Sequence, residues 1–274
     1  MIRTTGWRLL LPLLSVLLTA EVQALVIDAG PRYWIARYSV SHLDQIVGEM
    51  RRETHLDGQH YSIRSDLVPK GMGRLFGSDL IEQSSQGDQH GQGWRPQDYF
   101  FFQSSKPDKP RNFTFDWAAR KVSFADQVTG FSGELHDELS QMLVLRQRLA
   151  AGDREIDLQV LSGSKRRIYD YWYRVETEES VAVLPEDQPV AERAVRVMLT
   201  TSRGKYEMRF WLAMARDYLP LRIERTEIRK HRTAVMELIG LESGLAPFNS
   251  ASETTSQPSG TPPVRGSDTD LVSE

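Results

Sequence analysis

Apolar and polar side chains alternate with a period of two residues along most of this chain. In 206–212, four apolar side chains at even positions alternate with Glu207, Arg209 and Trp211. Side chains of a β-strand point to opposite faces in turn, so this pattern predicts strands with one buried face. The segments with strand character are 33–40, 46–54, 61–67, 78–83, 99–104, 111–117, 121–124, 155–161, 167–175, 195–199, 206–212, 221–228 and 234–241.

One segment, 138–151, has the features of a helix. Asp137 is suited to the N-cap position and Gly152 to the left-handed position after the last turn. No alternation of strands with helices occurs, so parallel pairing is not expected. A sheet of a dozen strands must curl, split or close. We therefore expect a mainly β fold, a large antiparallel meander curled into a partial barrel or curved sheet, with this one principal helix packed on it.

Both ends of the chain differ from the middle. Arg3 and Arg8 precede or border the uncharged run 9–20, which is followed by the small-x-small pattern of residues 22–24. This arrangement is typical of a signal peptide cleaved after Ala24, with cleavage after Ala20 or an uncleaved anchor as alternatives. We expect 1–24 to be a signal peptide, 25–242 a single β-rich domain, and the Ser/Thr/Pro-rich segment 243–274 a disordered tail.

Composition excludes several classes of protein. The chain has no cysteine, which excludes disulfide scaffolds, thiolate metal sites, cysteine nucleophiles and a lipidated lipoprotein terminus. Its formal net charge of -3 argues against a nucleic-acid partner. No apolar stretch reaches the ~20 residues that a membrane-spanning helix needs. We expect an exported, periplasmic protein that does not span the membrane.

No known catalytic or metal-binding motif stands out. The six histidines are scattered, and His55 and His60 flank a turn without forming a ligand pattern. The segment 130–133 lacks the second glycine of a serine-hydrolase elbow. His136, Asp137 and Ser140 are close in sequence, but capping explains Asp137 better than catalysis does. We expect no catalytic residue, no metal site and no cofactor.

Aromatic residues are denser than one buried face needs. This surplus favours a hydrophobic cavity on the concave face, covered by the helix, although a packed core would explain the same residues. Two basic turns, 165–167 and 229–232, could meet anionic lipid head groups or an acidic partner. The candidate ligand-binding residues are Leu139, Met142, Leu143, Tyr169, Tyr171, Tyr173, Phe210 and Trp211.

The order of several short motifs resembles a known family. These are the Pro-x-x-Tyr step at 96–99, the segments 113–117 and 137–140, then 143–146 with Gly152, and finally 211–213 with 218–222. Together they resemble the domain-of-unknown-function family 3108 of exported bacterial proteins, over roughly 33–241. The resemblance implies a periplasmic, mainly β protein without an established activity, and it carries over no catalytic residues.

The sequence thus predicts a non-catalytic periplasmic envelope factor that binds a hydrophobic, lipid-like ligand or an envelope protein partner. Two alternatives stay open. One is a structural or adaptor protein without a ligand pocket, which would use its sheet edges and tail. The other is a hydrolase whose site the motifs do not reveal.

Overall fold

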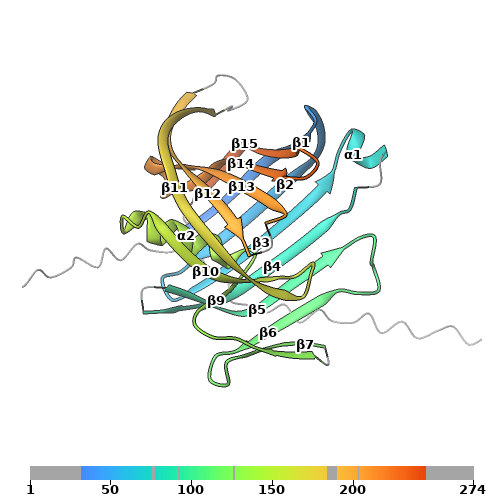
Figure 1. The fold of residues 1–274 in the computed structure, drawn as a ribbon, viewed down its shortest axis with the longest axis vertical. Helices are drawn as coiled ribbons and strands as arrows, with labels where there is room; N and C mark the ends of the chain where they lie inside the picture. The colour runs from blue at the N-terminus through green and yellow to red at the C-terminus, as the bar shows by residue number, and fades with distance from the viewer. Residues whose placement is uncertain are drawn as a thin grey trace, which may run out of the picture.

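The computed structural model describes residues 32–244, except 76–77, 92, 126, 184–189 and 203 (Figure 1). The predicted signal peptide, 1–24, lies outside these residues, as does the predicted tail apart from Ser243 and Gly244, which end the last strand. The described chain is mainly β, as predicted.

Fifteen strands and one helix of more than two turns make up the fold. The helix, α2, spans Ser140–Ala150, and two single turns, α1 (Met72–Leu75) and η1 (Met214–Arg216), lie in connections. The strands are β1 (Arg32–His42), β2 (Gln45–Leu56), β3 (His60–Pro69), β4 (Ile81–His90), β5 (Gly93–Gln103), β6 (Arg111–Asp116), β7 (Lys121–Phe124), β8 (Gln127–Gly130), β9 (Leu135–Asp137), β10 (Glu155–Ser162), β11 (Arg167–Val183), β12 (Val190–Thr201), β13 (Tyr206–Ala213), β14 (Leu219–Glu227) and β15 (Arg232–Gly244).

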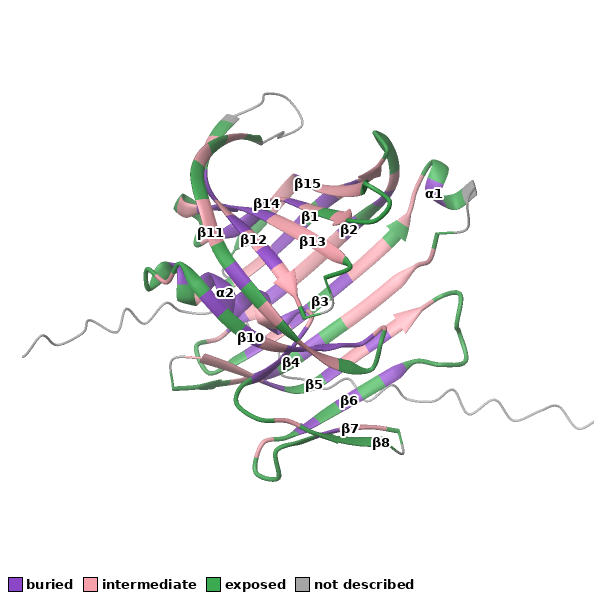
Figure 2. Cartoon of the chain, viewed as in Figure 1, coloured by how far each residue is buried: buried purple, intermediate pink, exposed green. Residues whose placement is uncertain are grey.

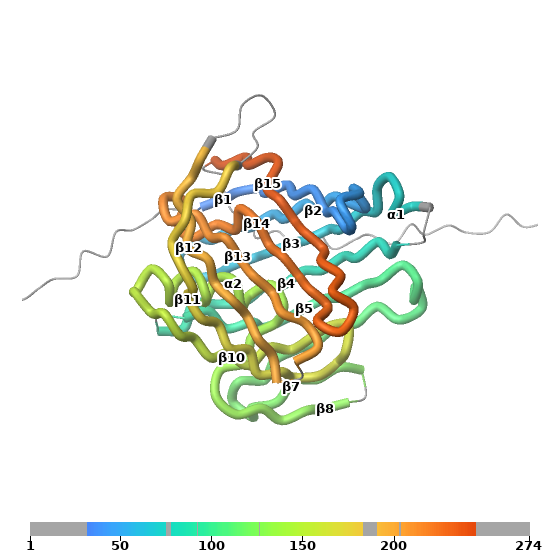
Figure 3. The backbone as a smooth tube through the Cα atoms, turned by 45° about the horizontal axis from the view of Figure 1, so that its top comes forward, coloured from blue at the N-terminus to red at the C-terminus, as the bar shows by residue number. Residues whose placement is uncertain are grey.

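All fifteen strands belong to one sheet in the order β8-β7-β6-β5-β4-β3-β2-β1-β15-β14-β13-β12-β11-β10-β9. Two meanders, β1–β8 and β9–β15, are therefore joined side by side through the first and last strands, with Tyr33 opposite Gly244. The sheet curls so that β10 to β12 lie in front of β1 to β5 (Figures 1 and 3). It is a strongly curved, unclosed sheet, as the strand count predicted.

Helix α2 lies between the two halves of the curled sheet and contacts both (Figure 2). Met142, Leu145 and Leu149 pack in one cluster with residues of β10 to β14. Leu139 and Leu143 pack in a second cluster with aromatic residues of β3, β5 and β6. Residues 142–146 are all buried, so this helix fills the interior and has no solvated face along that stretch.

Two local predictions need correction, and a third is confirmed. The helix begins at Ser140 and its N-cap is Leu139, because Asp137 belongs to the short strand β9. β9 pairs with β10 in parallel, since the chain reaches β10 only after passing through α2. Gly152 does take the predicted left-handed conformation, with φ of +93°.

Residues 87–90 form the end of β4, and Gly93 begins β5, although glycine is uncommon inside strands. The strand bulges between Gln86 and Gly87, and a Cβ at Gly87 would lie 2.0 Å from the carbonyl oxygen of Arg95. Glycine is therefore required by close backbone approach within a strand. The β11–β12 hairpin extends as far as the Val183–Val190 pair, well beyond the predicted strands 167–175 and 195–199.

Candidate functional site

A small cavity lies beneath α2, inside the curled sheet. Its volume is about 20 Å³, enough for about one water molecule. It is bounded by α2, by β1 to β3 and by the start of β14. The lining residues are Trp34, Ala36, Tyr38, Arg52, Thr54, Ile63, Leu139, Met142, Leu143, Arg146, Leu219 and Pro220.

The structure brings three of the predicted ligand-binding residues together at this cavity. Leu139, Met142 and Leu143 all line it. Each of these side chains is less than one-tenth exposed, so apolar surface meets the cavity from the helix side. The sequence argument placed a site under this helix, and the cavity lies there.

The predicted aromatic residues lie elsewhere in the fold. Tyr173 and Phe210 are buried in the cluster of β10 to β14, with ring centroids 6.1 Å apart, and Tyr171 packs against the same cluster. Tyr169 lies at the end of β11, opposite Val160. These residues form packed contacts and do not line the cavity.

Trp211 belongs to a different face of the sheet from Phe210. It lies directly opposite Arg196 on β12 and Arg222 on β14, and its indole nitrogen donates a hydrogen bond to Glu179. The guanidinium of Arg222 lies 5.5 Å from the Trp211 ring centroid. Strict alternation predicts this placement, because neighbouring residues of a strand point to opposite faces.

Two arginines at the cavity were missed by the sequence argument. Arg146 is 8% exposed and donates from Nε to the Asp217 carbonyl oxygen at 2.6 Å and from Nη2 to Asp217 Oδ2 at 3.1 Å. Arg52 contacts the Met50 sulfur at 3.8 Å. The sequence contained a signal for Arg52. This residue is two positions from each of the buried residues Met50 and Thr54 in β2, so its charged side chain lies on the inward face of the strand.

Burial affects the charge of both arginines. It lowers the pKa of Arg52 and that of Arg146, and the Asp217 carboxylate partly opposes the shift at Arg146. Both guanidinium groups stay protonated at neutral pH, because their ordinary pKa is above 12. The cavity therefore has a positive lining on one part of its wall and an apolar lining on another.

A polar network beside α2 joins the edge strand β9 to β4 and β3. Asp137 accepts hydrogen bonds from Ser85 Oγ (2.6 Å), Ser140 Oγ (2.9 Å) and the backbone N–H groups of Leu139 (2.7 Å) and Ser140 (2.9 Å). Tyr61 completes the chain through its hydroxyl, 2.9 Å from Ser85 Oγ. Burial raises the pKa of the Asp137 carboxyl despite these hydrogen bonds.

Glu138 extends the same network to β5 and to the β10–β11 turn. It accepts hydrogen bonds from the Tyr99 hydroxyl at 2.8 Å, from Ser162 Oγ at 2.9 Å and from the Gly163 N–H at 3.2 Å. Burial raises its pKa, with a smaller contribution from the charge of Asp137. These side chains, rather than a backbone ladder, hold β9 and α2 against β4 and β5.

The neighbouring His136 does not join the network. It is 1% exposed, and neither ring nitrogen has a hydrogen-bond partner within the described part of the chain. Ser140 Oγ donates a hydrogen bond to Asp137, but neither ring nitrogen of His136 is hydrogen-bonded to this pair. The arrangement therefore lacks the serine–histidine–carboxylate relay within the residues described.

His55 and His60 also lie in separate surroundings. His55 Nε2 lies 3.0 Å from Glu53, and His60 contacts Asp57 and Asp88 at 3.2 and 3.6 Å. Across the described ranges, no group of three or more histidine, aspartate or glutamate side chains could hold a metal ion. Nor does any described helix have the length and apolar character needed to cross a membrane.

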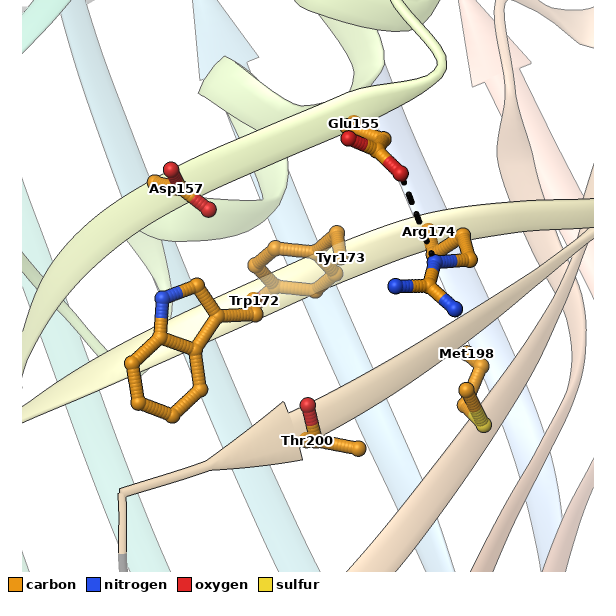
Figure 4. A pocket seen from close by; sticks show the side chains of 7 residues that line it. All are labelled: Glu155, Asp157, Trp172, Tyr173, Arg174, Met198 and Thr200. Carbon is orange, nitrogen blue, oxygen red and sulfur yellow. Dashed lines mark ion pairs between the residues drawn. The ribbon is translucent and has the colours of Figure 1, made fainter.

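The outer face of the sheet has a second, larger hollow of about 400 Å³ over β10, β11 and β12 (Figure 4). Trp172 is 43% exposed there, and the Glu155–Arg174 ion pair measures 3.5 Å. The sequence indicated this exposure, because alternation along β11 places Trp172 on the opposite face from the tyrosines of that strand. The lining residues are Glu155, Asp157, Trp172, Tyr173, Arg174, Met198 and Thr200.

The fold and these sites define a class: a curved-sheet, β-barrel-like protein with a helix enclosed by the sheet and a small cavity beneath it. A family model described as "Protein of unknown function (DUF3108)" matches residues 37–237. The chain belongs to this family, as its motif order indicated. No curated protein matches the chain significantly.

Solved structures support the fold. A β-barrel-like protein of the domain-of-unknown-function family DUF1849 from Brucella abortus has a TM-score of 0.52 and 13% identity, over 78% of this chain and 97% of that one. A predicted lipoprotein from Parabacteroides distasonis ATCC 8503 has a TM-score of 0.32 and 9% identity, over 78% of this chain and 96% of that one. The second likeness is too weak to support any argument.

Proposed function

We propose that this chain is a non-catalytic, exported envelope protein that binds a hydrophobic ligand between α2 and the concave face of the sheet. The observation that supports this most directly is the position of α2 inside the curl. Apolar side chains of this helix line a cavity there, on the concave side of the sheet. The signal-peptide pattern of residues 1–24 supports export.

Ligand entry requires α2 to move, because about 20 Å³ is far below the ~300 Å³ of typical ligand pockets. The contacts that hold α2 suit such a movement. At its N-terminal end they are hydrogen bonds that the carboxylates of Asp137 and Glu138 accept, and these can be exchanged one at a time. In this proposal α2 acts as a plug that a ligand displaces.

The test is to isolate the protein from the periplasm of cells that express it with its own leader. Native mass spectrometry should show a bound lipid-like mass that disappears after solvent extraction. The delipidated protein should then respond to added dodecanol with a saturable change in Trp34 fluorescence, because Trp34 lines the cavity. The Trp34→Phe variant identifies the responding residue. The proposal would be contradicted if the isolated protein had the mass of the polypeptide alone and dodecanol caused no change in Trp34 fluorescence.

The outer hollow favours a second candidate, an adaptor that binds a partner protein. An exposed tryptophan beside charged groups is typical of interface centres. If this candidate is correct, the wild-type protein binds no lipid, and Trp172→Ala abolishes its binding to the partner protein. The same variant leaves the first proposal unaffected, because Trp172 lies on the outer face.

A further inference from the structure

Among the residues that the structure describes, Arg52 has no ionic partner. Its polar contact is the Met50 sulfur at 3.8 Å, and its Nε is buried without an acceptor among the residues that the structure describes. The residues directly opposite are Ala36 on β1 and Ser65 on β3, neither of which carries charge. The Arg52 side chain is partly exposed, but its Nε is buried. A buried donor without an acceptor is costly, and an anion that entered the site would relieve that cost.

The second arginine adds to the positive charge. Arg146 shares a single carboxylate, Asp217, with Arg32, whose Nη1 lies 3.2 Å from Asp217 Oδ2. Asp217 is thus the carboxylate shared by two guanidinium groups, Arg32 and Arg146, and no ion pair joins it to Arg52. The ring of Trp34 lies 5.0 Å from the Arg146 guanidinium carbon and adds no negative charge.

Tyr38 provides a neutral polar group at the same cavity as the two arginines. Its hydroxyl donates to the Pro220 carbonyl oxygen at 3.1 Å, and both Arg52 and Arg146 act electrostatically on it. Leu139, Met142 and Leu143 line the same cavity. An occupant therefore meets cationic groups and apolar groups within one site, which matches an amphiphile with an anionic head.

We propose that the ligand of this site is an amphiphile with an oxyanion head, a carboxylate or a phosphate, held by Arg52 and Arg146 while its chain displaces the apolar face of α2. This inference rests on the proposed function, since it names the chemical class of the ligand. The planar fork of arginine matches both kinds of oxyanion through paired N–H donors.

Three probes separate the head from the chain. Dodecanoate carries both, dodecanol carries the chain alone, and acetate and inorganic phosphate carry the anion alone. Wild-type protein should bind dodecanoate at least tenfold more tightly than dodecanol, measured by Trp34 fluorescence and by calorimetry. Acetate and phosphate should bind far more weakly than dodecanoate.

Variants then assign the selectivity to Arg52. Arg52→Met should reduce dodecanoate affinity at least tenfold and leave dodecanol affinity unchanged, and Arg52→Lys should retain part of the preference. The matched control is Arg51→Met. Arg51 precedes Arg52 in β2, its side chain lies on the opposite face of the strand, and it forms an ion pair with Glu53 at 2.6 Å. This control should bind like wild type.

The outcomes distinguish the two proposals. Equal binding of dodecanoate and dodecanol overturns the oxyanion head while the hydrophobic site stands. Binding of free phosphate or acetate as tightly as dodecanoate overturns the amphiphile and leaves a free-anion site. No binding of any chain overturns both. The comparison among probes uses wild-type protein, so it does not depend on whether a variant folds.

Discussion

At the scale of single residues, His136 shows how burial without a partner affects stability. The ring lies in β9, opposite Val160 of β10, and neither nitrogen is hydrogen-bonded in the part of the chain that is described. Burial lowers the pKa of His136 to about 4. The native state therefore binds a proton at this residue less readily than the unfolded chain, whose ordinary histidine pKa is about 6.5.

The sign of the pH dependence follows. The neutral ring contributes its full stability above pH ~6.5, and that contribution is lost as pH falls towards about 4. His136→Leu removes the titration and keeps a side chain of similar size. Relative to this variant, the wild type should lose up to roughly 3 kcal/mol of unfolding free energy over that range.

Urea denaturation at several pH values measures the effect. The two carboxyls beside it, Asp137 and Glu138, titrate in both proteins and cancel in the difference. His90→Leu, at an exposed position near the end of β4, provides the control and should follow the wild-type profile. Parallel curves for wild type and His136→Leu would show that the buried ring does not control acid stability.

At the scale of elements, the turn between β10 and β11 closes the gap between the two ends of the sheet. Gly163 donates its N–H to Glu138, and its carbonyl oxygen accepts from Arg111 at 2.7 Å. A Cβ at Gly163 would lie 2.7 Å from Cβ of Phe101 and 2.8 Å from the Tyr99 hydroxyl oxygen. The turn therefore fits against β5 only with glycine at this position.

Gly163→Ala should lower the unfolding free energy by about 1 to 3 kcal/mol, because the added methyl group overpacks this contact. Gly130→Ala, where the nearest atom to the added Cβ is 3.9 Å away, serves as the control and should cost less than about 1 kcal/mol. Chemical denaturation compares the two. A Gly163→Ala variant as stable as Gly130→Ala would mean that the turn is not tightly held.

Most elements could be predicted from the sequence, because the alternation of 33–40 or 206–212 reflects one buried face. β9 could not, since a three-residue strand gives no periodicity and both its faces are covered. The sequence argument named three apolar helix residues that line the cavity, but it did not name the two arginines that give the lining its positive charge. Arg52 and Arg146 have inward positions, but only the curl brings β2 and α2 together, and that contact joins residues far apart in sequence.

At the scale of the whole molecule, the first and last strands pair in the middle of the sheet. Tyr33 and Gly244 are direct neighbours across β1 and β15, so a short linker can join the two ends. The exposed turn 105–109 between β5 and β6 can then carry new termini.

A circular permutant of residues 32–244 with these termini should fold to the same structure. Its unfolding free energy should fall by no more than about 2 kcal/mol, since loop closure depends weakly on length. Circular dichroism and thermal melting provide the comparison. A permutant opened between Glu138 and Leu139 is the contrast, because it cuts the hydrogen-bond network of Asp137 and should fold poorly. Equal stability of both permutants would contradict the role given to that network.

The pairing of β1 with β15 also sets an order in time. A ribosome releases β1 first and β15 last, so β1 pairs with β2 early but keeps an open edge until residues 232–244 have been made. An open strand edge is a site for incorrect pairing with another chain. A chain that emerges from its N-terminal end, from a ribosome or from an export channel, therefore completes the centre of this sheet last, and the edge of β1 stays open until β15 arrives.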